Sequence, residues 1–455
     1  MVPLGNTPHP MRVIATESDL LVLVEQRGGA SEYHWSSHLR PDPLVNATFE
    51  AIRVGWNASR GRCIFTTMQI KRGELLMREP ALAHVAFSKA TSARGTGTAG
   101  LDEYGLDEPT IQLAVKAAGR QSGRQLVTAL SASRDEDVRT LGVVASRLRT
   151  SGRLPPHLSG LTDALLGQLF LRIKCNLHVS HDDDTAAAAT GVGLYPAAAL
   201  LNHDCVPCAC FSWTDGGRYM NVHALRDLTA GEEVTCSYLT DEQLYAPWEE
   251  RQALLREAFQ FEPVEPPLRA EAERAAQGKV SGALAQQARR LIGAAHRSLA
   301  GGGEAGGGEA GSRAAAEEAA GELVEFVESR LQGTLHPFHA LVQEAHAALL
   351  AVARRIEEPM LVARTALHLI AAREAMLPVG TPHLASLYAS HGSALCTVLR
   401  EGGLASDQER RDVAKGALRS LTASHRIREY CLGAKHPLTV ATAAAVQHAS
   451  DTSAF

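Results

Sequence analysis

The spacing of apolar and polar residues changes several times along the chain. Between Thr48 and Val85, short alternating pieces such as "FEAIRVGW" and "GELLMREPALAHV" are separated by Gly, Asn and Lys-Arg-Gly turns, which predicts β-strands. The same alternation returns over residues 205–240, where "YMNVHALRDLTAGEEVTCSY" turns at Ala230-Gly231. Because "RDLTAGEEV" resembles the earlier "MQIKRGELL", we predict two hairpins of one type, within one β-rich domain that an insertion divides.

Helical spacing occupies much of the remaining chain. Residues 108–120, 135–152 and 161–176 carry apolar side chains three and four positions apart, with acidic residues in the first turns, which predicts helices. From residue 322 to 448 the pattern predicts a further four or five amphipathic helices. The helices follow one another at about the 34-residue repeat of tetratricopeptide-like helix pairs. The predicted fold class is therefore α+β, followed by an all-α C-terminal region.

Breaks in composition mark the predicted domain boundaries. The Pro-rich "EPVEPP" ends the β-rich domain, and "GGGEAGGGEAGSRAAAEEAAG" predicts a low-complexity linker, because its Gly content resists ordering. A chain of 455 residues is also too long for a single hydrophobic core. The predicted parts are an N-terminal extension (1–45), a β-rich domain in two pieces (46–89 and 161–262), a helical insert between them (90–160), a linker (263–321) and a helical C-terminal domain (322–455).

Charge and cysteine content narrow the class of protein. The formal net charge of −5 argues against holding nucleic acid through overall charge and favours a protein or small-molecule partner. Eight irregularly spaced cysteines do not suit the framework of a small disulfide-rich domain, so we expect a reducing compartment. No apolar run reaches the length of a membrane span. The sequence therefore predicts a cytoplasmic or nuclear protein that does not bind membranes.

The stretch "GLYPAAALLNHDCVPCACF" is the strongest candidate for chemistry. In it an apolar run is followed directly by Asn202, His203, Asp204 and Cys205. One interpretation is structural: these residues cap and cross-link a buried turn, because buried Asn and His are usually kept for their hydrogen bonds. The other interpretation is a binding site. Polar or permissive residues also stand at the ends of other predicted elements, where sites are usually assembled, and these are Arg60-Gly61, Asn176 and Tyr238.

The motifs taken together resemble a known family. "RGRC" is followed by "IKRGELL", "LPPHL" precedes "IKCN", and "GVGLYPAAALLNHDC" precedes "ALRDLTAGEEVTCSY". Over residues 48–89 and 160–262 the chain resembles the SET domain of the SET-and-MYND (SMYD) protein lysine methyltransferases. "LHPF" at 335–338 and "KHP" at 435–437 resemble the start and end of that family's helical C-terminal domain. The resemblance implies a split, β-rich SET domain with a helical insert, followed by tetratricopeptide-like helices.

The resemblance also implies a binding site for S-adenosylmethionine. By similarity, the cofactor-binding residues are Arg60, Gly61, Arg62, Asn176, Asn202, His203, Tyr238 and Phe261. Among them, Asn202 and the backbone of His203 would hold the amino-acid and adenine parts of the cofactor in a knot-like crossing. Phe261 would stack on the adenine through its aromatic face.

Catalysis by such a site depends on a neutral lysine amine. An unperturbed lysine, with a pKa of about 10.4, is almost fully protonated at neutral pH. A narrow, desolvated channel beside the sulfonium cation lowers that pKa, and the Tyr238 hydroxyl with backbone carbonyls can then align the amine. Tyr238 is thus the implied catalytic residue, although a tyrosine that only packs its ring at a strand end is the structural alternative. Phe259 lines the same channel in place of a second tyrosine of the family.

Several residues depart from the family pattern. Cys63 stands where the family has the second glycine of a Gly-x-Gly turn, so its side chain either crowds the cofactor or keeps the backbone from positive φ. Asp204 stands in place of a serine and brings an acid to the site. Residues 81–160 contain no cysteine, which predicts the absence of the zinc-binding MYND module.

Zinc is not expected at the SET domain either. Pro263 and Glu265 stand where the family has post-SET cysteines. Three cysteines remain close together, at positions 205, 208 and 210. Either they are buried thiols that act as small hydrophobes, or His223 or Cys236 completes a metal site with them. We expect no metal, and the methyl transfer needs none.

The sequence thus favours an S-adenosylmethionine-dependent protein-lysine N-methyltransferase that acts on a histone or non-histone protein. The substrate peptide would bind between the SET core and the helical C-terminal domain, which can also recruit a protein partner. The alternative is a non-catalytic, SET-like interaction scaffold, in which Cys63 and Phe259 mark a degraded site. A third hypothesis keeps the enzyme but changes the acceptor to another amine or a histidine ring.

Overall fold

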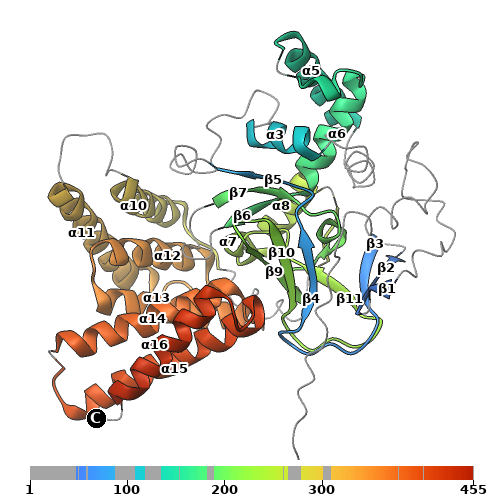
Figure 1. Ribbon diagram of the computed structural model, residues 1–455. Helices are drawn as coiled ribbons and strands as arrows, with labels where there is room; N and C mark the ends of the chain where they lie inside the picture. The colour runs from blue at the N-terminus through green and yellow to red at the C-terminus, as the bar shows by residue number, and fades with distance from the viewer. Residues whose placement is uncertain are drawn as a thin grey trace, which may run out of the picture. The chain divides into compact units, whose positions relative to one another are not determined.

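The architecture is described from a computed structural model of the chain (Figure 1). The described residues are 48–49, 51–57, 60–87, 108–117, 135–152, 154–181, 189–259, 261–264, 278–300, 309–377, 379–402 and 404–453. The predicted extension at 1–45 lies outside them. Internal contacts divide the chain into two compact units, of which the first contains Met1–Tyr238 with Ala258–Gln260 and the second contains Leu239–Glu257 with Phe261–Phe455.

Among its described residues, the first unit contains three β-sheets. The largest has the strand order β1 (Thr48–Phe49), β2 (Ile52–Asn57), β3 (Gly61–Thr66), β11 (Glu233–Cys236) and β8 (Asn202–His203). The second has the order β4 (Leu75–Pro80), β10 (Tyr219–Ala224) and β9 (Ala209–Thr214), and the third has β5 (Ala83–Ala86), β7 (Ala189–Leu194) and β6 (Leu177–His181). The strands predicted on both sides of the insertion are thereby confirmed.

The five-stranded sheet brings three distant segments together. Strands β2 and β3 form an antiparallel hairpin, and β11 joins β3 with Glu233 opposite Phe65. Strand β8 then pairs with β11 in parallel, so that Asn202 lies opposite Thr235 and His203 opposite Cys236. The residues of the sequence motifs therefore meet on three neighbouring strands, β3, β11 and β8, of which β8 is the edge strand.

The two predicted hairpins do not form as separate units, and that prediction was wrong. Ile70 and Leu228, which precede the two turns, pair with each other through reciprocal backbone hydrogen bonds of 2.9 Å. The strands that follow the turns, β4 and β11, belong to different sheets. Both apolar side chains are 1% exposed, so the mutual pairing buries them together. Gly73 (φ 86°) and Gly231 (φ 82°) supply the left-handed conformation in each turn.

Helices of the predicted insert and the first helix that follows it form one core with the third sheet. They are α3 (Glu108–Ala117), α5 (Asp135–Thr150), the 3₁₀ turn η1 (Pro156–Leu158) and α6 (Asp163–Asn176), and a further 3₁₀ turn, η2 (Ala198–Leu200), precedes β8. The helices predicted at 108–120, 135–152 and 161–176 are confirmed. Their apolar faces form one core with the sheet, which includes Leu113, Leu141, Leu166, Phe170 and Val192.

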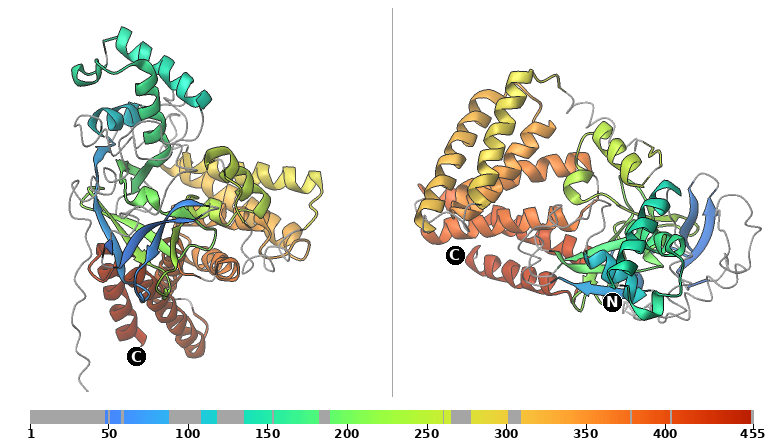
Figure 2. Two further views of the ribbon diagram at one scale, coloured as in Figure 1. Left: turned by 90° about the vertical axis from the view of Figure 1, so that its right-hand side faces the viewer. Right: turned by 90° about the horizontal axis from the view of Figure 1, so that it is seen from above.

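The elements described in the second unit are all helices or helical turns. Its elements are α7 (Asp241–Leu244), α8 (Trp248–Phe259), α10 (Gly282–Ala300), α11 (Glu309–Phe326), the π-helical turn η3 (Val327–Leu331), α12 (Ala340–Arg355), α13 (Pro359–Met376), α14 (Pro382–Glu401), α15 (Asp407–Leu432) and α16 (Pro437–Ser453). The last two residues of α8 belong to the first unit. Consecutive helices from α12 to α16 pack on one another, as the orange and red ribbons show in every view (Figure 2). None of the described helices is both long and apolar enough to cross a membrane.

The structure differs from the predicted linker at 263–321. Helix α10 occupies 282–300 and α11 begins at Glu309, while 265–277 and 301–308 lie outside the described residues. Helix α10 is amphipathic: Leu284, Ala288 and Leu291 follow the spacing of one helix face, and this face is buried. The Ala-rich start of α11 favours a helix because alanine has the highest helix propensity. Only the Gly-rich part of the stretch retains the composition of a linker.

Candidate active site

The side-chain amide of Asn202 lies at the centre of the candidate site. Its Nδ2 donates to the carbonyl oxygen of Arg62 at 2.8 Å and to Oε1 of Glu233 at 2.9 Å. The same nitrogen lies 3.2 Å from Sγ of Cys63. Because both amide protons are directed at these protein groups, the carbonyl Oδ1 points to the opposite side of the planar amide. The half-buried Asn202 is therefore held in one orientation by two strands of the sheet.

Arg60 lies between two carboxylates beside this amide. Its Nη1 is 3.5 Å from Oε2 of Glu233, and its Nη2 is 4.0 Å from Oδ2 of Asp204. Asp204, the residue in place of the family's serine, also accepts a 2.8 Å hydrogen bond from the backbone N–H of Val206. The side chain of Glu233 is 17% exposed, whereas those of Arg60 and Asp204 are 36% and 33% exposed. The site thus combines one cation and two acids within reach of a fixed amide.

Cys63 packs inside the first unit. It lies in β3 opposite Gly55, is fully buried, and its backbone does not have positive φ. Burial and, to a lesser extent, the neighbouring Glu233 raise the pKa of the thiol to about 12. The Cys63 side chain is therefore a neutral thiol at pH 7 that contacts the Asn202 amide. The absence of positive φ at Cys63 agrees with the expected effect on the backbone, and crowding of a cofactor by its side chain stays a prediction.

His203 and Tyr238 are linked by a backbone hydrogen bond. The N–H of Tyr238 donates to Nδ1 of His203 at 2.9 Å, so the ring proton of a neutral His203 resides on Nε2. That Nε2 lies 3.3 Å from Sγ of Cys205. Both ring nitrogens of His203 therefore have a partner, which orients the ring. The ring is buried and lies beside the Tyr238 ring, so it anchors β8, the strand that also carries Asn202.

The Tyr238 hydroxyl has a defined donor role. It donates to the carbonyl oxygen of Leu201 at 2.7 Å, and burial raises the pKa of the phenol, so the group stays protonated. The Phe259 ring lies 4.9 Å from the Tyr238 ring, centroid to centroid. The two residues predicted to line the substrate channel are thus adjacent, and Tyr238 does more than pack its ring.

The remaining predicted site residues are Asn176, Phe261 and Gly61. Asn176 ends α6, and its Nδ2 donates to the carbonyl oxygen of Arg172 at 2.6 Å, so its predicted contact with a cofactor stays a prediction. Phe261 belongs to the second unit, and its stacking on an adenine likewise stays a prediction. Gly61 has φ 75°, and a Cβ there would meet the Trp56 ring at an ordinary 3.7 Å. Its backbone conformation, rather than space, calls for glycine at this turn.

Sequence reasoning missed two acids. Glu233 is the second acid of the "GEEV" stretch and begins β11, the strand that pairs with the Asn202 strand; an acid at the start of a predicted strand was a usable signal. Glu79 is fully buried in β4, and its carboxylate oxygens accept hydrogen bonds from the backbone N–H groups of Ala197 and Ala198, both at 2.8 Å. Burial raises the pKa of Glu79 to about 7, against the opposing effect of these two hydrogen bonds. Glu79 therefore fixes the turn that leads into Asn202.

The cysteines near the site make contacts within the protein. Cys205 faces His203, and Sγ of Cys208 accepts from the backbone N–H of Thr235 at 3.2 Å. Burial raises the pKa of the thiols of Cys208 and Cys236. Over the ranges of the chain that the structure describes, no group of three or more His, Cys, Asp or Glu is arranged to hold a metal ion.

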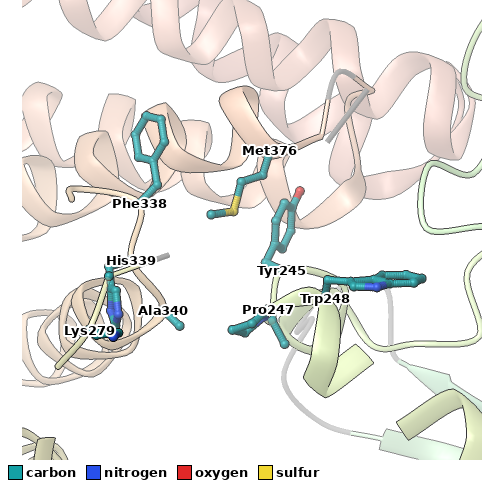
Figure 3. A pocket seen from close by; sticks show the side chains of 10 residues that line it. Tyr245, Pro247, Trp248, Lys279, Phe338, His339, Ala340 and Met376 are labelled. Carbon is teal, nitrogen blue, oxygen red and sulfur yellow. The ribbon is translucent and has the colours of Figure 1, made fainter. Parts of the chain in front are cut away.

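A separate cavity of about 320 Å³ lies within the second unit. Figure 3 shows Tyr245, Pro247 and Trp248 on one side and Phe338 and His339 on the other. Lys279 and Met376 also contribute to the lining. The Tyr245 ring is held in place by the guanidinium of Arg373, whose carbon lies 3.9 Å from the ring centroid. The walls are mostly apolar with a few polar groups, which is the composition of a ligand-binding cavity.

Comparison with known protein families identifies the domain to which most of the described first unit belongs. Residues 61–239 match the family model for the SET domain, which spans the β3, β8 and β11 strands of the candidate site. The chain therefore contains a SET domain, and its sequence is similar to SMYD-type SET-domain proteins. The resemblance found in the sequence motifs is confirmed.

The similarity to individual relatives covers part of each chain. Mouse "Histone-lysine N-methyltransferase SMYD3" is 28% identical over 141 residues, which are 30% of this chain and 30% of that protein. The human protein of the same name is 31% identical over 115 residues, 25% of this chain and 24% of that protein. Chicken "N-lysine methyltransferase SMYD2" is 30% identical over 105 residues, 23% of this chain and 22% of that protein. The matched part of the chain thus spans less than a third of the length of these relatives.

Proposed function

We propose that the protein is an S-adenosylmethionine-dependent protein-lysine N-methyltransferase. The observation that carries this proposal is that Asn202, His203 and Tyr238 lie together with the Arg60–Cys63 segment at the SET-domain sheet. Asn202 is hydrogen-bonded to Arg62, and His203 is hydrogen-bonded to Tyr238. The SET domain and its SMYD-type relatives, which are named as lysine methyltransferases, support the same class of reaction. The acceptor would be a lysine of a histone or non-histone protein, in the cytoplasm or the nucleus.

The groups at the site suit the amino-acid part of such a cofactor. That part carries both an ammonium and a carboxylate, and the site offers the Glu233 and Asp204 carboxylates together with the Arg60 guanidinium. The fixed Asn202 amide directs its carbonyl oxygen away from the protein acceptors. Arg60, Gly61, Arg62, Asn202 and His203 would hold the cofactor, with Asn176 and Phe261 as further proposed contacts. The cofactor supplies a methyl group activated by its sulfonium sulfur.

Tyr238 would position the acceptor amine. The Tyr238 hydroxyl donates its proton to the Leu201 carbonyl. Because a phenol oxygen can accept hydrogen bonds as well as donate one, it would accept a hydrogen bond from the amine. Its raised pKa excludes the phenol as a base at pH 7, so the lysine proton would leave to solvent before transfer. The apolar Phe259 beside it supports desolvation of the amine, which favours its neutral form. The neutral nitrogen would then accept the methyl group, and the electron pair of the broken bond would stay on the sulfur.

Substrate recruitment is proposed for the helical second unit. The aromatic and apolar cavity between α8, α12 and α13 supports this role, because such walls suit an apolar side chain of a protein substrate. The methyl transfer proposed here requires no zinc.

The test is a calorimetric titration of S-adenosylhomocysteine into the full chain and into Asn202→Ala. We expect micromolar binding to the wild type and its loss in the variant, because Asn202 links the cofactor to β3 and β11. A methylation assay with protein substrates, with Tyr238→Phe as the inactive control, then tests transfer to lysine. Absence of binding in the wild type would contradict the proposal and favour the interaction scaffold.

A further inference from the structure

We propose that Glu233 is a positioning residue that presents both Asn202 and Arg60 to the cofactor. The inference rests on the proposed function, because it concerns the same cofactor site. Glu233 begins β11, the strand that lies between β3 and β8. Its backbone therefore stands between the two segments that carry Arg60 and Asn202.

The two carboxylate oxygens of Glu233 have separate partners. Oε1 accepts from Nδ2 of Asn202 at 2.9 Å, while Oε2 lies 3.5 Å from Nη1 of Arg60. One side chain thus fixes an amide on β8 and a guanidinium at the start of the β3 turn. The side chain is largely buried, so water competes less with these contacts than at an exposed ion pair.

The charge of Glu233 explains why an acid is needed at this position. Asn202 retains the Arg62 carbonyl as an acceptor without Glu233, but that contact alone leaves the second amide proton to the weakly accepting Cys63 sulfur. Of its ion pairs with described residues, Arg60 would retain the longer, more exposed one with Asp204. Both cofactor contacts would then lose orientation together. A hydrogen bond to a carboxylate is stronger than one to a neutral acceptor, so the neutral Gln variant keeps part of the effect.

The adjacent Glu232 provides a matched control. Its carboxylate accepts from the backbone N–H of Thr229 at 2.9 Å and lies 2.5 Å from Nη1 of Arg226. These partners belong to the turn before β11 rather than to the candidate site. Glu232→Ala therefore removes an acid of the same size from the same segment without touching Asn202 or Arg60.

The experiment measures S-adenosylhomocysteine binding by calorimetry for wild type, Glu233→Ala, Glu233→Gln and Glu232→Ala, with a melting temperature for each protein without ligand. We expect the dissociation constant to rise about tenfold in Glu233→Ala and about threefold in Glu233→Gln. Glu232→Ala should bind as the wild type does. In methylation assays the KM for the cofactor should rise with the dissociation constant, while the KM for the protein substrate stays the same.

Each outcome decides the inference. Wild-type affinity in both Glu233 variants overturns it and leaves the proposed function standing if Asn202→Ala still abolishes binding. An equal loss in Glu232→Ala would also overturn it, because the effect would then come from the turn. If Glu233→Ala does not fold, the isosteric Glu233→Gln decides: weaker binding at an unchanged melting temperature supports the role. A wild-type protein that does not bind the ligand overturns the inference and the proposed function together.

Discussion

Replacing the buried Glu79 with glutamine should change how stability depends on pH. The carboxylate of Glu79 accepts two backbone hydrogen bonds from Ala197 and Ala198 but is fully buried. Burial raises its pKa from 4.5 to about 7. In the folded protein it therefore binds a proton at pH values where the unfolded chain has already released one.

The sign and size of the effect follow from this difference in pKa. A raised folded-state pKa gives stability that is complete below pH 4.5 and is lost as the pH rises through about 7. At about 1.4 kcal/mol for each pKa unit, the full loss is about 3 kcal/mol, and most of it falls between about pH 5 and pH 8. Glu79→Gln cannot ionise, so the difference in unfolding free energy between wild type and variant should shift by about 2 to 3 kcal/mol over this range.

Urea unfolding of wild type and Glu79→Gln at a series of pH values, followed by fluorescence, measures this shift. Glu74→Gln serves as the control, because the Glu74 carboxylate accepts a 3.0 Å hydrogen bond from the backbone N–H of Lys71 at the protein surface. Parallel pH profiles for wild type and Glu79→Gln would refute the reasoning, since they would mean that Glu79 binds its proton equally in both states.

Two further predictions concern the site itself. Tyr238→Phe should reduce kcat by about 100-fold, because it removes the oxygen that positions the amine. Calorimetry should show that the variant binds S-adenosylhomocysteine with an affinity within about threefold of wild type. A large loss of affinity would mean that the Tyr238 hydroxyl acts mainly in cofactor binding. Cys63, with its pKa raised to about 12, should react with iodoacetamide at pH 8 at least about 100 times more slowly in the folded protein than in urea. Peptide mass spectrometry gives both labelling rates, and similar values would show that the thiol is accessible and ionised.

Local periodicity predicted the elements but not their long-range partners. The helices at 108–120, 135–152 and 161–176 were found because their apolar faces repeat within the segment itself. Ile70 and Leu228 pair although they lie in the two different pieces of the divided β-rich domain, far apart in the sequence. Each local stretch taken alone also fits a hairpin. Helix α10 was missed because the Gly-rich composition that follows it was extended to the whole stretch.

The candidate site was predictable where motifs carried it. Asn202, His203 and Tyr238 stand in motifs whose family resemblance names their roles, and the structure brings them together. The roles of Glu79 and Glu233 depend on which backbone N–H groups and side chains face them across different strands. Such contacts depend on which strands are neighbours in a sheet, and the pattern of a single segment does not predict its neighbours.

The position of β11 between β3 and β8 also sets the order in which the site can be made during synthesis. The ribosome delivers β3 first and β8 much later, yet neither pairs directly with the other in the sheet order. The strand that joins them, Glu233–Cys236, emerges last. A nascent chain that ends before this strand lacks the partner of both β3 and β8, so the contacts that hold Asn202 can form only after Glu233–Cys236 has been made.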